Sequence, residues 1–195
     1  MDIESHPLQP FIPEGARLLM LGSFPPARHR WSMDFFYPNF QNDMWRIFGL
    51  VFFGDKDHFV DNEARTLRCE EIIKLLNREG IALYDTATKV IRTQNTASDK
   101  DLEVVTPTDL DSLLKRMPML EGVVTTGQKA TDLFTEHFKI AQPKVGESVT
   151  FEFYGKELRL WRMPSSSRAY PMKVDRKAEI YESILFELWM QSKPI

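Results

Sequence analysis

The chain alternates between short apolar runs and longer segments in which apolar residues recur at helical spacing. Short apolar runs bounded by glycine or proline are typical of strands buried on both faces. Four runs fit this description: 17–22, 81–84, 122–126 and 158–163. Helical spacing and end signals predict helices over 42–48, 65–78, 108–116, 129–138 and 175–191. The alternation predicts an α/β fold, a three-layer α/β/α sandwich around a short, mainly parallel central sheet.

Three segments depart from this alternation. Residues 150–154 and 158–163 flank Gly155-Lys156, which predicts a hairpin turn leading into the last core strand. Residues 85–108 are polar with few apolar anchors, so we expect a long functional loop there. An arm without a predicted element precedes the first strand and contains Pro7, Pro10 and Pro13.

The composition narrows the class of protein. With 195 residues, 43% of them hydrophobic, the chain can bury one sizeable core, so we expect a single domain over 1–195. The net charge of −3 means that any nucleic-acid surface must be local. A single cysteine, Cys69, excludes a disulfide framework and a thiolate-rich metal site. The apolar run 47–53 is too short to cross a membrane, and we expect a cytoplasmic protein with no membrane partner.

The unusual residues gather where the predicted parallel strands end. In such sheets, ligands bind beyond the carboxyl ends of the strands. The loops at these ends are Gly22-Ser-Phe-Pro-Pro-Ala-Arg28, Asp85-Thr-Ala-Thr88, Thr125-Thr-Gly-Gln-Lys129 and Met163-Pro-Ser-Ser-Ser-Arg168. The sequence therefore predicts that the functional site lies at this edge of the sheet.

Taken together, the first and last of these loops resemble the uracil-DNA glycosylase superfamily, whose members carry a Gly-x-x-Pro loop and a Pro-Ser loop in this order. Between them, Phe35-Phe-Tyr-Pro-Asn-Phe-Gln-Asn-Asp-Met-Trp45 is similar to a segment of the mismatch-specific uracil and hypoxanthine-DNA glycosylase branches. Residues 80–85 and 97–102 also resemble segments of those branches. The resemblance implies a DNA-repair glycosylase of base excision repair that flips a deaminated base, hypoxanthine or uracil, out of DNA and hydrolyses its N-glycosidic bond with water.

The first loop departs from the pattern of the uracil-removing relatives. Where they often carry a catalytic Asp or Asn, this chain has Ser23 and Phe24. In hypoxanthine-DNA glycosylases an Asn before the Trp is the catalytic candidate, and the resemblance aligns Asn42 with it. The segment is one residue longer here, so Asn39 is a competing alignment.

Hydrolysis of an N-glycosidic bond passes through an oxocarbenium-like sugar and needs a placed water and a pocket for the departing base. Asn42 or Asp43 could orient the water through a side-chain oxygen. For base binding we expect Gly22 and Ser23 to offer backbone donors, and the rings of Phe24, Phe36 and Tyr37 to offer stacking surfaces. The four histidines, His6, His29, His58 and His137, are scattered, so we expect neither a metal nor a cofactor.

For DNA binding, Pro164, Ser165, Ser166 and Ser167 offer hydroxyl and backbone donors to phosphates, and Arg168 could fill the gap left by the flipped base. Lys129 lies on another loop at the same edge. A local basic excess opposed only by Asp175 supports a polyanion partner: Arg159, Arg162, Arg168, Lys173, Arg176 and Lys177. We expect the partner to be DNA with a damaged or mismatched base, bound by a monomer.

Other interpretations of these residues remain open. The aromatic residues 35–45 could be ordinary core, as we expect for Trp45. Asp85 could assist catalysis, but a cap of the following turn is favoured. The fold could serve an inactive DNA-binding module, with Phe24 marking a lost water site, or a nucleotide-processing hydrolase that never meets a duplex.

Overall fold

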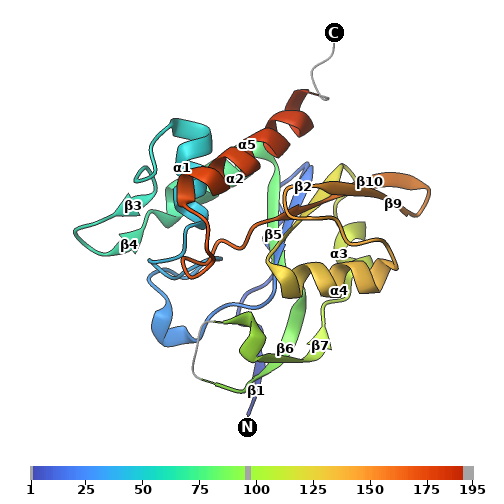
Figure 1. Cartoon of the computed structure of the whole chain (residues 1–195), viewed down its shortest axis with the longest axis horizontal. Coiled ribbons are helices and arrows are strands. Elements are labelled where there is room, and N and C mark those ends of the chain that lie inside the picture. Colours follow the sequence, from blue (N-terminus) through green and yellow to red (C-terminus); the bar gives the residue numbers. More distant parts are fainter. Residues whose placement is uncertain (1, 95–97, 191–195) are drawn as a thin grey trace.

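The computed structural model describes residues 2–94 and 98–190 and contains a five-stranded central sheet with the order β5-β2-β8-β10-β9 (Figure 1). Four strands run parallel: β2 (Leu18–Gly22), β5 (Ile81–Asp85), β8 (Gly122–Thr126) and β10 (Lys156–Met163). The edge strand β9 (Ser148–Phe153) pairs antiparallel with β10 through a tight turn at Tyr154 and Gly155. The expectation of a mainly parallel sheet is therefore corrected to a mixed one, because a hairpin this short can join only antiparallel strands.

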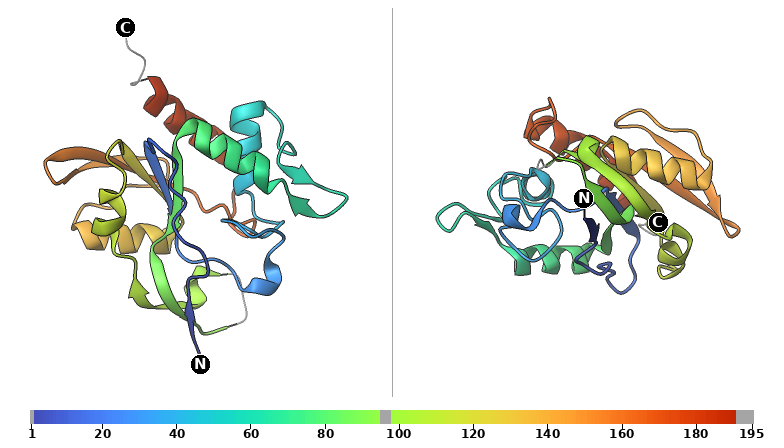
Figure 2. Two further views of the ribbon diagram at one scale, coloured as in Figure 1. Left: turned by 180° about the vertical axis from the view of Figure 1, so that it is seen from behind. Right: turned by 90° about the horizontal axis from the view of Figure 1, so that it is seen from below.

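Helices cover both faces of this sheet (Figure 2). On one side lie α1 (Met44–Phe53), α2 (Cys69–Glu79) and α5 (Val174–Met190), and on the other lie α3 (Leu110–Lys115) and α4 (Gln128–Phe138). The chain crosses from β2 to β5 in one direction and from β5 to β8 and β10 in the other. Right-handed crossovers then place the connecting helices on opposite faces, which gives three layers. None of the helices within 2–94 and 98–190 has the length and apolar character that a membrane crossing requires.

The predicted loop over 85–108 is mostly wrong, because the segment forms a β-hairpin. Its strands β6 (Ala87–Arg92) and β7 (Leu102–Pro107) flank a single turn of 3-10 helix, η2 (Asp99–Asp101), and residues 95–97 lie outside the described part. Register shifts interrupt the pairing between Ala87 and Val90. These irregularities break the alternation of apolar and polar positions by which a strand is recognised in a sequence.

The N-terminal arm also contains a strand that the sequence did not reveal. Strand β1 (Ile3–Ser5) pairs antiparallel with β6, so a second sheet has the order β1-β6-β7. Further along the arm, the backbone of Phe11 exchanges hydrogen bonds with that of Leu83 in β5. Three residues are too few to show a period, and their partners lie far along the chain, from Ile3 with Ile91 to Ser5 with Lys89. The arm is thus anchored across the end of the central sheet.

The largest differences between predicted and observed helix boundaries are at the end of α1, which extends to Phe53 instead of residue 48, and at the start of α2. Helix α2 begins at Cys69 rather than at residue 65, because β4 (Thr66–Leu67) pairs with β3 (Val60–Asp61). It ends at Glu79, and the following Gly80 caps it in the left-handed conformation with φ 68°. Helix α3 is capped by the Asp109 side chain, which accepts a hydrogen bond from the Ser112 N–H. The predicted end of the last helix, residue 191, lies outside the described residues.

The sheet packs closely at Gly122, the first residue of β8. A Cβ atom there would lie 2.2 Å from Cζ3 of Trp161 and 2.8 Å from the carbonyl oxygen of Arg159. Glycine is required at this position because the indole of Trp161 covers the backbone of the neighbouring strand.

We expect Gly122→Ala to lower the free energy of unfolding by about 1–3 kcal/mol, since the added methyl group forces the indole or the strand to move. Urea unfolding followed by circular dichroism measures this change. Glu136→Ala, on the exposed face of α4, is the control and should change stability by less than about 0.5 kcal/mol. Equal stabilities of the two variants would show that Trp161 moves away at no cost.

Candidate functional site

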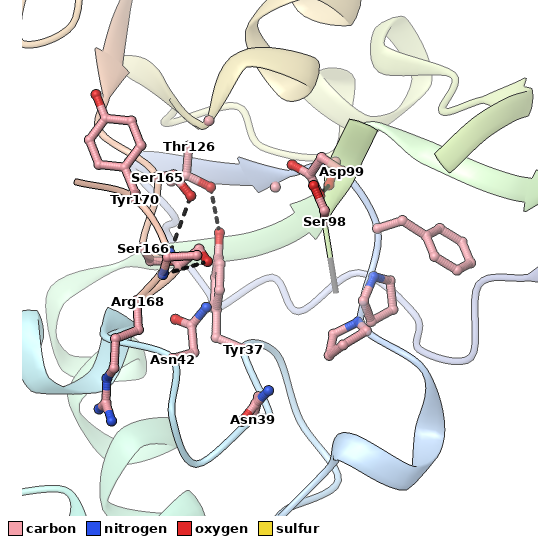
Figure 3. Close-up of a pocket in the computed structure, with 18 of the residues that line it drawn as sticks. Tyr37, Asn39, Asn42, Ser98, Asp99, Thr126, Ser165, Ser166, Arg168 and Tyr170 are labelled. Atoms are coloured by element: carbon pink, nitrogen blue, oxygen red, sulfur yellow. Dashed lines mark hydrogen bonds between the residues drawn. The ribbon is translucent and has the colours of Figure 1, made fainter. Parts of the chain in front are cut away.

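A cavity of about 600 Å³ opens at the carboxyl ends of the parallel strands. Its walls come from the loops after β2, β8 and β10, which were expected to meet there, and from Asp85 at the end of β5. Part of the β6–β7 hairpin, including the segment around η2, completes the wall. Figure 3 shows Tyr37 in the middle of the cavity, with Asn42 beside it, Ser98 and Asp99 on one side and Ser165 and Tyr170 on the other. Segments far apart in the sequence thus meet around one space.

Tyr37 is held in an unusual conformation. Its φ of 50° lies in the left-handed region, which residues other than glycine rarely adopt. Its hydroxyl group forms a hydrogen bond with the Thr126 hydroxyl at 3.1 Å. Burial, followed by the nearby charge of Asp85, raises the pKa of the Tyr37 phenol far above its usual range. The phenol therefore stays protonated and can act as a fixed donor and as an aromatic surface in the cavity.

Asn42 and Asn39 both line the cavity, and both side-chain oxygens accept a backbone hydrogen bond. The Asn42 Oδ1 accepts from the Met44 N–H at 2.9 Å, and the Asn39 Oδ1 accepts from the Gln41 N–H at 2.9 Å. Each amide NH₂ group therefore remains available to a ligand or water. In Figure 3, Asn42 lies next to Tyr37, whereas Asn39 lies farther from that ring.

Arg46, which was not singled out from the sequence, holds the backbone of residues 39–42 (the asparagine segment) in place. Its Nη1 donates to the carbonyl oxygens of Phe40 at 2.7 Å and of Asn42 at 3.1 Å. Burial, followed by the charge of Arg168, lowers the pKa of Arg46 from its usual value. Its position one helical turn after Asn42 was the available signal, because a side chain at that spacing can reach back to the start of the helix.

Asp43 does not line the cavity. Its Oδ2 accepts from the Lys177 Nζ at 3.0 Å, and its Oδ1 lies 3.5 Å from the Arg168 Nε. The Asp43 N–H donates to the Ser166 carbonyl oxygen at 2.9 Å, and Lys177 also donates to the Ser167 carbonyl oxygen at 2.8 Å. This buried network holds together the start of α1, the loop 164–168 after β10 (the serine loop) and α5. The structure thus places Asp43 as a support behind the cavity wall.

Asp85 lies in the cavity and is paired with His6 of the N-terminal arm. The His6 Nε2 and the Asp85 Oδ2 are 2.8 Å apart, and the side chain of His6 is 2% exposed. The turn-cap role favoured from the sequence is not what its side chain does. His6 was read in the sequence as one of four scattered histidines, since 79 positions separate it from Asp85 and only the pairing of β1 with β6 brings it here.

Asp99 is the second carboxyl group in the cavity. Its Oδ1 accepts a hydrogen bond from the Ser23 hydroxyl at 2.7 Å. Burial raises the pKa of Asp99, and the charge of Asp85 raises it further, whereas Ser23, Lys129 and Arg92 act in the opposite direction. Asp99 belongs to the segment 97–102, which resembles the glycosylase branches, but the resemblance assigned it no role.

The remaining candidates for base binding differ in how accessible they are. Gly22 and Ser23 line the cavity, and a Cβ atom on Gly22 would lie 2.6 Å from the Asp85 Oδ1. Phe24 also lines it, but it is buried in a small cluster with Ala87, Val90 and Leu102. Phe36 contributes to the wall while belonging to the main core. Trp45 is fully buried, and its indole N–H donates to the Phe36 carbonyl oxygen.

The serine loop lies along the cavity as expected, with Pro164, Ser165, Ser166, Ser167 and Arg168 in its wall. Two of its hydroxyl groups accept hydrogen bonds within the loop, Ser165 from the Ser167 N–H and Ser167 from the Ala169 N–H. The side chain of Arg168 is 52% exposed. Figure 3 shows it directed away from Thr126 and Asp99, toward the outer side of the loop.

Many of the basic residues expected to bind DNA instead form ion pairs or hydrogen bonds with other residues of this chain. Arg159 pairs with Glu187, Arg176 with Glu179, and Lys177 with Asp43, while Arg162 donates to Gln128, Gln142 and Pro143. Lys129 donates to the Leu102 carbonyl oxygen at 2.6 Å and is not part of the cavity wall. The cations that do line the cavity come from five separate segments: Arg30, Arg92, Lys100, Arg162 and Arg168.

In the part of the chain that the structure describes, no three His, Cys, Asp or Glu side chains are placed to share a metal ion.

The fold matches that of a solved structure. A solution NMR structure from Methanosarcina acetivorans, described as a "putative Uracil DNA glycosylase", superposes with a TM-score of 0.63 at 19% sequence identity, covering 96% of this chain and 99% of that chain. The chain therefore has a uracil-DNA glycosylase-like α/β fold. No protein-family model and no curated protein matches the sequence.

We expect Ser23→Ala to raise the pKa of Asp99 further, because the hydroxyl group donates a hydrogen bond that stabilises the charged carboxylate. Carboxyl-carbon NMR titration measures this pKa. Ser112→Ala is a matched control, since Ser112 donates in the same way to Asp109 on α3. The control should raise the pKa of Asp109 and leave Asp99 unchanged, and an unchanged Asp99 in Ser23→Ala would refute the assigned hydrogen bond.

We expect Lys177→Met to lower the free energy of unfolding by about 3–5 kcal/mol, since Asp43 then keeps a buried charge without its closest partner. Lys74→Met removes an exposed pair with Glu71 and should cost about 1 kcal/mol or less. Urea unfolding compares the two. The double variant Asp43→Asn, Lys177→Met should regain part of the loss, and no recovery would argue that Lys177 stabilises the fold by packing alone.

Proposed function

We propose that this protein is a DNA glycosylase that hydrolyses the N-glycosidic bond of a deaminated base, hypoxanthine or uracil, without a cofactor. The observation that carries this proposal is the cavity at the carboxyl ends of the parallel strands, in which the Asn42 amide, the Tyr37 ring and two carboxyl groups face one space. The resemblance of the loop sequences and the uracil-DNA glycosylase-like fold support the same reaction.

The cavity suits a base that has left the DNA stack. A flipped base needs an aromatic face to lie on and polar groups at its edge. The Tyr37 ring offers such a face, and the backbone of Gly22 and Ser23 lies in the cavity wall, where Gly22 adds no side chain. A volume of about 600 Å³ is large enough for a base with its sugar.

The reaction needs a positioned water and negative charge near the sugar, because the transition state resembles an oxocarbenium ion. Asn42 orients the water through its amide group, and its backbone is held by Arg46. A carboxylate in the cavity stabilises the positive charge that develops on the sugar. Asp43 and Arg46 hold this segment in place, and Asn39 is the second choice for the water-orienting amide.

DNA binding rests on the rim of the cavity. Arg168 has a side chain that is 52% exposed, and it would turn from its position beside Asp43 toward the cavity to occupy the gap left by the flipped base, while the loop from Pro164 to Ser167 contacts the neighbouring phosphates. The favoured partner is DNA with a damaged or mismatched base, bound by a monomer in the cytoplasm.

The test is base release from labelled oligonucleotides that contain hypoxanthine, uracil, xanthine or a thymine mismatch, in single- and double-stranded form. Heat and alkali then cleave the abasic product. We expect release from a hypoxanthine or uracil substrate, and a loss of about 100-fold or more in kcat for Asn42→Ala with little change in DNA affinity. Asn77→Ala, on helix α2 and outside the cavity wall, is the matched control and should keep full activity.

Two outcomes would contradict the proposal in different ways. Salt-dependent DNA binding without release of any base would favour an inactive binding module of the same fold. Neither binding nor release would favour a hydrolase that acts on free nucleotides. If Asn42→Ala and Asn39→Ala were both as active as the unmodified protein, neither asparagine would orient the water.

A further inference from the structure

We propose that the Asp85 carboxylate accepts the proton of the attacking water, and that His6 of the N-terminal arm is the positioning residue that holds this carboxylate in place. The inference rests on the proposed glycosylase function and adds a catalytic residue to it. It starts from the buried pair that these two residues form in the cavity.

The hydrogen bonds of His6 define which of its nitrogens carries the proton. The Leu8 N–H donates to the Nδ1 at 3.1 Å, so this nitrogen has no proton of its own. The Nε2 must then carry the proton and donate it to the Asp85 Oδ2, 2.8 Å away. His6 is therefore a neutral imidazole aimed at one oxygen of a carboxylate. A neutral donor supports the charged carboxylate without cancelling its charge.

The other oxygen of Asp85, the Oδ1, lies beside Gly22, and both residues line the cavity. Among the described residues, no group donates a hydrogen bond to the Oδ1. It lies 2.6 Å from the point where a Cβ on Gly22 would stand, and the Tyr37 hydroxyl lies 3.4 Å from that same point. A side chain at position 22 would collide with the carboxylate, so glycine allows the Asp85 Oδ1 and the Tyr37 hydroxyl to lie close to the same stretch of backbone in the cavity wall, where one water molecule could contact both.

Asp85 supplies a carboxylate near the loop after β2, which has no acidic or amide side chain at residues 23 and 24. Residues 23 and 24, at the carboxyl end of β2, offer no acid or amide that could act on water. Asp85 ends the neighbouring strand β5 and is the pairing partner of Gly22 across the sheet. A carboxylate from the adjacent strand therefore reaches the space above the first loop.

The two carboxyl groups of the cavity are in contrasting environments, which separates their roles. Asp99 receives a hydrogen bond from Ser23, and burial and the charge of Asp85 raise its pKa, so Asp99 binds a proton more readily than an exposed aspartate does. Asp85 receives its hydrogen bond from an imidazole and keeps one oxygen open. The titratable groups around Asp85 are His6 from the arm, Tyr37 from the loop after β2, Tyr84 from β5 and Asp99 from η2. Paired acids with contrasting surroundings are a recurrent arrangement for acid and base roles.

The proposed step balances in atoms and charge. The water oxygen bonds to C1′ of the deoxyribose as the bond from C1′ to the base nitrogen breaks, and the electrons of that bond leave with the base as an anion. One proton of the water passes to the Asp85 Oδ1, and the other remains in the new C1′ hydroxyl group. The base anion then takes up a proton, while Asp85 returns its proton to solvent.

The test compares single-turnover rates on the oligonucleotide from which the unmodified protein releases its base. Asp85→Asn removes the charge but still offers an oxygen to His6, so the fold is preserved, and we expect a loss of about 100-fold or more in rate with DNA affinity retained. The matched control is Asp111→Asn, which alters the exposed pair of Asp111 with His137 outside the cavity wall. It should keep full activity.

The pH profile tests the part that His6 plays. His6→Phe keeps an aromatic ring beside Phe24 and Tyr84 but removes the donor, so the acidic limb of the rate profile should move to higher pH by about one unit. His6→Gln retains an N–H group at the position of the Nε2 and should restore most of the original profile. His137→Phe serves as the control with an unchanged profile.

Each result decides between support and refutation. A rate for Asp85→Asn within threefold of the unmodified protein would overturn the role of Asp85 while leaving the glycosylase function intact. A uniform loss at every pH in His6→Phe would make His6 a packing residue and would overturn its positioning role. Absence of base release by the unmodified protein would overturn this inference and the proposed function together.

Discussion

The buried ammonium group of Lys177 holds the cavity wall together. Its two acceptors, the Asp43 carboxylate and the Ser167 carbonyl oxygen, belong to segments that are 124 residues apart in sequence, at the start of α1 and in the loop after β10. A charge with no exposure to solvent must find such partners, because an unpaired one would cost several kcal/mol. Lys177 therefore connects α5 to the start of α1 and to the loop after β10, and so holds the asparagine segment close to the serine loop.

The polar content of the cavity follows from how the parallel strands end together. Gly22 and Asp85 are paired across β2 and β5, so the small residue and the acid stand side by side at one edge. Burial of the nearby Asp99 raises its pKa, and the Tyr37 phenol stays protonated for the same reason. The site thus combines the carboxyl group of Asp85, the buried carboxyl group of Asp99 with its raised pKa and one neutral hydroxyl group, a set that suits chemistry on a developing cation.

The N-terminal arm contributes to the site as well as to the fold. Pairing of β1 with β6, followed by the backbone contacts of Phe11 with Leu83, carries His6 along the end of the central sheet. The imidazole then packs against Phe24 and Tyr84, and its two ring nitrogens form hydrogen bonds with the Leu8 N–H and the Asp85 carboxylate. A solved structure with 19% identity shares this overall fold, which shows how little sequence similarity the architecture requires.

The sequence by itself determined the elements of the central sheet and the edge at which its site lies, because continuous apolar runs and glycine stops are local signals. It also pointed to Asn42 and the serine loop, which stand within recognisable motifs. Only the tertiary structure decided that Asp43 is fastened to Lys177, that residues 85–108 form a hairpin and that His6 meets Asp85. These depend on pairings between distant segments and on an irregular strand register, for which a single sequence carries no periodic signal.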